Sequence, residues 1–306
     1  MTKTTKPTLT FGRMKRQYGT DEACKALLTQ LRWSDGKIAC PRCGETKKVY
    51  KTSQAYRWKC KACNANGYRF SVLTGTVFEN TNVPLRTWFE VAFLMVSSKK
   101  GISALQVHRM IDPVRGSKGS YKTAWYMCHR LRAAMQGDLS KLGGTVEIDE
   151  TYVGGKERNK HRSKRRGVGG GVGGKVGVIG AIARKGNVIA RVMERGLDVA
   201  TVEGFVREAI SDKVSLVASD DNKQYEFMYY GPHARHESVN HSDGEYVRGD
   251  VHTANLDSFW SLLKRGIIGT YHKVSKGYLP LYLNEFSWRH NNRDNEQIFH
   301  AVLAGC

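Results

Sequence analysis

Four of the seven cysteines in this chain stand in two Cys-x-x-Cys pairs, and this spacing constrains the fold more than any other feature. Cys40 and Cys43 form the first pair, and Cys60 and Cys63 form the second, sixteen residues later. Two such turns supply the four tetrahedral sulfur ligands that a structural Zn²⁺ prefers. An iron–sulfur cluster or a redox pair could use the same thiols, but no other feature supports either. We therefore expect a zinc ribbon over residues 36–80.

The remaining sequence features place the chain in a reducing compartment. An odd number of cysteines with paired spacing fits metal binding in the cytoplasm better than a disulfide framework. The basic start of the chain lacks the apolar segment of a secretory signal. The sequence has no run of about 18 apolar residues, so we expect no membrane span. We expect a cytoplasmic protein.

The charge balance indicates a polyanionic partner. The chain of 306 residues has a formal net charge of +21, and its 40% hydrophobic content predicts folded domains. A membrane surface is the rival partner, but the basic residues are spread along the chain and no single amphipathic helix carries them. Nucleic acid is therefore the favoured partner.

Apolar spacing predicts a helix-rich segment on each side of the ribbon. A short helix is expected at 21–33, and three more at 84–98, 101–111 and 120–135. The last two, separated by a Gly- and Pro-containing break, suggest a helix-turn-helix that reads DNA. A plain helical spacer that packs and reads nothing is the alternative. The chain then divides into an N-terminal helical arm (1–35), the ribbon (36–80), a helical DNA-binding segment (81–140) and a C-terminal domain (141–306).

The pattern of the C-terminal domain predicts an α/β fold. Alternation predicts a strand at 145–153, with Val146 and Ile148 on one face and Glu147, Asp149 and Thr151 on the other. Further elements follow in the order of a strand pair, a helix, an apolar strand and two helices, at 175–183, 187–194, 199–211, 214–221, 252–266 and 278–292.

Three acids occupy positions that suit a metal site. Asp149 lies on the polar face of the first strand, Asp220 ends another apolar strand, and Asp257 begins a helix. Hard cations such as Mg²⁺ take oxygen ligands, and a pair of ions serves phosphodiester chemistry. Each acid alone is a weak candidate, since acids at strand ends are often solvated or cap helices. Their neighbours Glu147, Glu150 and Asp221 are competitors.

Long stretches of the chain resemble one known family. VEIDETYVGG, SDDNKQY, HSDGEYVRGDVHT and SFWSLLKRGIIGTYH closely resemble acidic-triad (DDE-type) transposases of bacterial insertion sequences that carry an N-terminal zinc ribbon, with an ISXO2-like transposase domain. The resemblance implies a ribonuclease-H-like catalytic domain, a mixed sheet flanked by helices. It also implies metal-dependent cleavage and strand transfer of DNA, served by two Mg²⁺ ions.

The resemblance assigns the site residue by residue. Asp149, Asp220 and Asp257 match the three acids, and Lys264 matches the basic residue two helical turns after the third. The family usually has glutamate at the third position, so Asp257 is one methylene shorter. Asn255 is an alternative third ligand, because an amide oxygen can also bind a hard ion. This departure keeps open a catalytically inactive or co-opted DNA-binding protein, and a nuclease of the same fold is a further alternative.

The DNA contacts are expected on basic side chains in three places: the loop after the first strand, the last helix of the helical segment, and the helix of the third acid. These residues are Lys160, Arg162, Lys164, Arg165, Arg166, Lys122, Arg130, Lys264 and Arg265. The family also implies double-stranded DNA partners, namely terminal inverted repeats and target DNA. A homodimer or higher synaptic assembly on paired ends follows from the same resemblance. So does a bacterial source, with the protein associated with the nucleoid.

Overall fold

The computed structural model describes residues 9–64, 66–111, 120–137, 140–155, 161–164, 174–194, 196–229, 235–240, 244–245 and 247–306. The chain forms two compact units, each described by itself: residues 1–136 with 292–306, and residues 137–291. No helix in the described ranges is long and apolar enough to cross a membrane.

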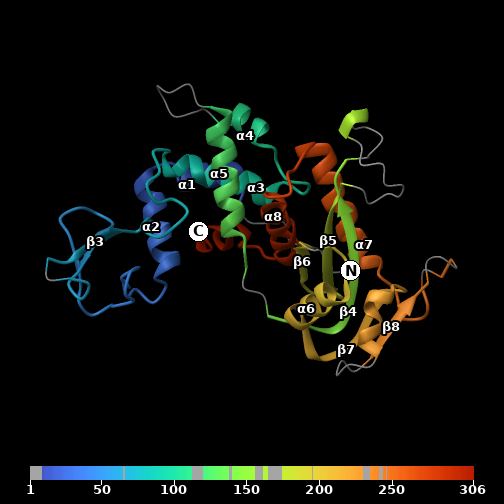
Figure 1. Ribbon diagram of the computed structural model, residues 1–306. Coiled ribbons are helices and arrows are strands. Elements are labelled where there is room, and N and C mark those ends of the chain that lie inside the picture. The colour runs from blue at the N-terminus through green and yellow to red at the C-terminus, as the bar shows by residue number, and fades with distance from the viewer. Residues whose placement is uncertain are drawn as a thin grey trace. The chain divides into compact units, whose positions relative to one another are not determined.

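The first unit combines a small sheet with helices. Helices α1 (Phe11–Gln17) and α2 (Asp21–Arg32) precede three short strands, β1 (Val49–Lys51), β2 (Arg57–Cys60) and β3 (Tyr68–Ser71). These strands pair antiparallel in the order β1-β2-β3. Helices α3 (Leu85–Ser97), α4 (Ala104–Met110), α5 (Tyr121–Ala134) and α9 (Ile298–Ala304) complete the unit (Figure 1).

Aromatic side chains form the core of the small sheet. The ring of Trp58 lies 5.1 Å from that of Trp33 and 5.9 Å from that of Phe70, measured between centroids, and all three are buried. Such rings bury a large area per residue, which suits a module too small for an ordinary core. The three strands and their cysteine turns confirm the predicted ribbon.

Serine and threonine side chains cap the N-terminal ends of several helices of this unit. Thr20 accepts a hydrogen bond from the backbone N–H of Ala23 and so caps α2, while Ser103 and Ser120 cap α4 and α5 in the same way. The helices predicted at 21–33, 84–98, 101–111 and 120–135 are therefore confirmed, with ends that differ by at most three residues. The predicted break between α4 and α5 falls on residues 112–119, outside the described ranges.

The second unit is built on one five-stranded mixed sheet. Its strands are β4 (Leu142–Val153), β5 (Val176–Ala183), β6 (Val188–Val192), β7 (Ile210–Asp220) and β8 (His236–Val239), in the order β6-β5-β4-β7-β8. Strands β4, β5 and β6 pair antiparallel, whereas β7 runs parallel to both β4 and β8. This is the mixed sheet expected for a ribonuclease-H-like fold.

Helices cover both faces of this sheet (Figure 1). Helix α6 (Val199–Ala209) packs on the face that carries Val146 and Ile148. Helices α7 (Ala254–Gly266) and α8 (Leu279–Asn291) pack on the other face, which carries Val153 and Val178. The remaining elements are the 3₁₀ helices η2 (Arg162–Lys164) and η3 (Lys223–Tyr229) and the π-helical turn η5 (Ile267–Tyr271).

Two boundaries differ from the sequence expectation. Helix α6 ends at Ala209 because β7 begins at the next residue, so β7 is longer than the predicted strand at 214–221. The predicted C-terminal domain runs to residue 306, but α9 packs on α2 and α3 in the first unit. The division into four parts remains a prediction.

Candidate functional site

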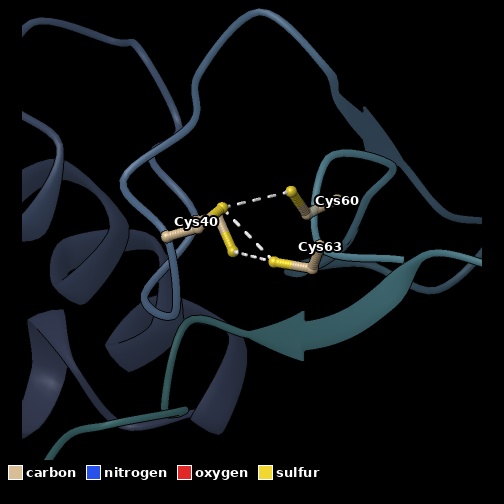
Figure 2. Close-up of side chains that lie close together, drawn as sticks. Cys40, Cys60 and Cys63 are labelled. Carbon is tan, nitrogen blue, oxygen red and sulfur yellow. Dashed lines mark hydrogen bonds between the residues drawn. The ribbon is translucent and has the colours of Figure 1, made fainter.

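The four paired cysteines converge at one end of the small sheet. Cys40 and Cys43 lie on the turn before β1, while Cys60 ends β2 and Cys63 follows it. Figure 2 shows sulfur atoms from the two turns facing one another. The Sγ–Sγ distances are 3.7 Å for Cys40–Cys63, 3.7 Å for Cys43–Cys60 and 3.3 Å for Cys43–Cys63.

These distances fit a tetrahedral metal site. All four sulfur atoms lie within 4.8 Å of one another. A Zn–S bond of about 2.3 Å places the sulfurs of a regular tetrahedron about 3.8 Å apart. Because all four positions would be filled by protein ligands, the arrangement suits a structural ion rather than a catalytic one.

Strand β4 carries the first acid at the centre of the larger sheet. Its side chains alternate as predicted, so Asp149 and Glu147 share the face that α7 covers, while Ile148 enters the opposite core. Asp149 pairs with Gly180 of β5. That glycine leaves space for an aromatic ring, because a Cβ atom at position 180 would lie 2.6 Å from the ring of Trp260.

Trp260 binds the first acid directly. Its indole Nε1–H donates a 3.0 Å hydrogen bond to Oδ2 of Asp149. The rest of the ring is buried in the core beneath α7, so Trp260 is both a core residue and a partner of the acid. Helical spacing shows which face of α7 is apolar, but it does not show what lies opposite.

Burial sets the protonation behaviour of Asp149. The pKa of its carboxyl is raised to about 7, chiefly because burial disfavours the charged form. The negative charges of Glu150 and Asp257 raise it further, in that order, and the hydrogen bond from Trp260 opposes the shift. A carboxylate in this setting gains from a nearby cation, which would favour its charged form.

The second acid ends the neighbouring parallel strand. Glu147 of β4 pairs with Ala218 of β7, and the two acids each stand two residues further along their strands. Oδ1 of Asp220 accepts a 2.7 Å hydrogen bond from the backbone N–H of Asp221. Asp149 and Asp220 thus lie on adjacent central strands, although they are 71 positions apart in the sequence.

The third predicted acid lies in the first turn of α7. Asp257 is exposed, and its Oδ2 accepts a 3.3 Å hydrogen bond from the hydroxyl of Thr253. Its negative charge contributes to the raised pKa of Asp149. Lys264 is exposed two turns further along the same helix, as its spacing predicted.

A buried glutamate holds the start of α7. Both oxygens of Glu147 accept hydrogen bonds there: Oε2 from the backbone N–H groups of Asn255 (2.9 Å) and Leu256 (3.1 Å), and Oε1 from the Asn255 side chain (2.7 Å). Arg184 pairs with the same carboxylate at 3.0 Å. Glu147 therefore acts as a distant N-cap for α7, satisfying N–H groups that a helix start leaves unpaired. The amide of Asn255, our alternative third ligand, donates to this carboxylate.

The three acids are not gathered as closely as the four cysteines. Among the described residues, the cysteine quartet is the one group of three or more metal-binding side chains with ligand atoms all within 4.8 Å. The donors are carboxylates, the type that Mg²⁺ prefers, and waters and substrate phosphates usually complete its shell.

The predicted DNA-contacting residues differ in their surroundings. Lys122, Lys264 and Arg265 are exposed. The guanidinium of Arg130, by contrast, lies 5.4 Å from the ring centroid of Tyr126 and donates to the backbone carbonyls of Thr76 and Glu79. In the loop after β4, Arg162 is exposed and Lys164 ends η2, while Lys160, Arg165 and Arg166 lie outside the described residues.

Comparison with known proteins gives two family matches and one curated relative. Residues 141–291 match the ISXO2-like transposase domain, and residues 19–66 match the transposase zinc-ribbon domain. An uncharacterized protein in transposable element ISH50 of Halobacterium salinarum is 32% identical over 276 residues, which cover 86% of this chain and 88% of the relative. That relative is archaeal, so it lends no support to our expectation of a bacterial source.

Proposed function

This chain belongs to the ISXO2-like transposase family with an N-terminal zinc ribbon, and we propose that it cleaves DNA at the ends of an insertion element and joins them to target DNA. The observation that carries the proposal is that Asp149 and Asp220 lie on the adjacent central strands β4 and β7 of a ribonuclease-H-like sheet. Asp257, in the first turn of α7, contributes to the raised pKa of Asp149.

The acids would hold two Mg²⁺ ions, which supply Lewis-acid activation of a water or 3′-hydroxyl and stabilise the leaving oxygen. Asp149 and Asp220, set by the sheet, fix the position of the site. Asp257 approaches from the helix and closes it on one side, with Asn255 as the alternative ligand. Lys264 is exposed two turns after Asp257 on α7 and contacts a DNA phosphate. The neighbouring Arg265 is exposed too and makes a contact of the same kind. In the ribbon, Cys40, Cys43, Cys60 and Cys63 hold a structural Zn²⁺.

The DNA partner follows from the family and from the charge of +21. The N-terminal unit binds the terminal inverted repeats, and Lys122 lies exposed on α5, its proposed DNA-reading helix. The basic residues from Lys160 to Arg166, which follow Asp149 in the sequence, contact the phosphate backbone. The active assembly is a dimer or larger synaptic complex, since two ends must be joined in one event.

One observation favours a second candidate, a DNA-binding protein that has lost catalysis. The third position holds the short side chain of Asp257, and the acids do not converge to 4.8 Å among the described residues. A strand-transfer assay on the element's own ends with Mg²⁺ or Mn²⁺ separates the candidates. Joined product supports the transposase; cleavage without joining or end preference indicates a nuclease; end binding without product supports the inactive protein.

A further inference from the structure

Glu150 follows Asp149 on β4 and points to the opposite face of the sheet. From sequence alone it competes with Asp149 for the role of first acid. In the structure, its carboxylate is occupied by two donors from one neighbouring segment. Oε1 accepts from the Asn222 side chain at 2.8 Å, and Oε2 accepts from the hydroxyl of Tyr225 at 2.6 Å.

Both donors belong to the turn that follows the second acid. The backbone N–H of Asn222 donates to the carbonyl of Asp220 at 2.9 Å, and that of Tyr225 donates to the carbonyl of Asn222 at 2.9 Å. This chain of short contacts makes the segment from Asp220 to Tyr225 a compact turn. A shift of Tyr225 or Asn222 therefore displaces the backbone of Asp220.

The Tyr225 contact lies in the interior. Tyr225 belongs to the 3₁₀ helix η3, and its ring is fully buried in the core under α6. Burial and the neighbouring charge of Glu150 keep the pKa of this hydroxyl well above its ordinary value, so it remains a donor. A charge-assisted hydrogen bond of this kind is short and strong.

We propose that Glu150 is a positioning residue that anchors the Asp220–Tyr225 turn to β4. Glu147 anchors α7, which carries Asp257, from the same strand. The glutamates on either side of Asp149 thus place the other two acids relative to it. This inference rests on the proposed function, because it assigns Glu150 a role in the geometry of that metal site.

The test measures Mn²⁺ binding by titration calorimetry to the full-length, zinc-loaded protein. The variants are Glu150→Gln, Tyr225→Phe and the double variant, with Asp149→Asn as the reference for loss of the site. Glu226→Gln is the matched control, because Glu226 is an exposed acid next to Tyr225. Far-UV circular dichroism checks that each variant is folded.

Glu150→Gln and Tyr225→Phe should each raise the Mn²⁺ dissociation constant about fivefold or more. The dissociation constant of the double variant should lie within about twofold of that of the weaker-binding single variant. Such non-additivity is expected because both changes disrupt the same hydrogen bond between Tyr225 and Glu150. Glu226→Gln should bind as the unchanged protein does. Strand-transfer rates should fall in the same order.

Three results would overturn the positioning role. If Asp149→Asn weakens Mn²⁺ binding but Glu150→Gln does not, the contact has no bearing on the site. If Glu150→Gln weakens binding while Tyr225→Phe leaves it unchanged or tightens it, Glu150 is a direct ligand. If Asp149→Asn binds Mn²⁺ as the unchanged protein does, the proposed metal site itself is refuted, and the positioning role with it.

Discussion

The carboxylate of Glu147 accepts hydrogen bonds from both the backbone N–H and the side-chain amide of Asn255, across 108 positions of sequence. One residue of β4 thereby fixes where α7 begins. The first helical turn carries Asp257, so this contact sets how the third acid approaches the sheet.

Replacing Glu147 with glutamine should destabilise the protein by about 3 kcal/mol. The side chain is fully buried, and glutamine removes the charge that pairs with Arg184 and replaces one of the two acceptor oxygens with an NH₂ group that faces donors. Urea unfolding measures the change. Glu203→Gln, which breaks an exposed pair with Arg207, is the control and should cost under about 1 kcal/mol. Equal losses in the two variants would contradict the anchoring role of Glu147.

Trp260→Phe keeps most of the buried ring but removes the N–H that holds Asp149. We expect the free energy of unfolding to fall by about 1 kcal/mol. The strand-transfer rate and the Mn²⁺ affinity should each fall by a larger fraction than the stability does. Trp288→Phe on α8 is the matched control for ring size. If both variants lose the same small amount of activity, the Trp260–Asp149 hydrogen bond does not orient the acid.

Gly180→Ala tests the close approach of the ring to the sheet. The added methyl would lie 2.6 Å from the Trp260 ring, so the ring must move away from β5. The expected cost is about 1–3 kcal/mol in the free energy of unfolding. Gly204→Ala on α6 has no neighbour within 4 Å and should be neutral or stabilising. A Gly180→Ala protein as stable as the unchanged one would refute this packing.

Without divalent metal, stability should fall as the pH rises from about 4 to about 7. The folded protein raises the pKa of Asp149 to about 7 from an ordinary value of 3.8, so in that window it binds a proton that the unfolded chain has released. The loss is on the order of 2 kcal/mol after allowing for partial solvent access. Denaturant unfolding at both ends of the window measures it. Asp149→Asn should remove most of the slope, and an unchanged slope would contradict burial as its cause.

Cys40→Ser should abolish metal binding by the ribbon and unfold it locally, because a structural zinc site and its fold form together. Elemental analysis should find about one zinc per chain in the unchanged protein and in Cys128→Ala, whose cysteine lies on α5 outside the quartet. Iron in the purified protein, or zinc retained in Cys40→Ser, would overturn the zinc assignment.

Local patterns predicted much of this molecule. The cysteine spacing predicted the ribbon because the two cysteines of each pair lie within a few residues of each other on one turn. Alternation along β4 predicted which side chains share a face with Asp149, and helical spacing placed Lys264 two turns from Asp257.

The contacts that organise the acids were not predictable from local patterns. Glu147 meets Asn255, and Asp149 meets Trp260, only after β4 and α7 are packed together from positions more than 100 residues apart. The same is true of α9, which packs on α2 and α3 in the first unit although it ends the sequence given. Glycine at position 180, opposite Asp149, was a signal that a bulky side chain lies there.

Strand transfer by single acid variants, on DNA carrying the element's ends, tests the central claim most directly. Asp149→Asn, Asp220→Asn and Asp257→Asn should each lower the rate by at least about a thousandfold while end binding stays within about threefold. Asp257→Glu should keep or raise the rate, since the longer side chain reaches further into the site. Full strand transfer by either Asp149→Asn or Asp220→Asn would contradict the assignment of these acids as the catalytic site.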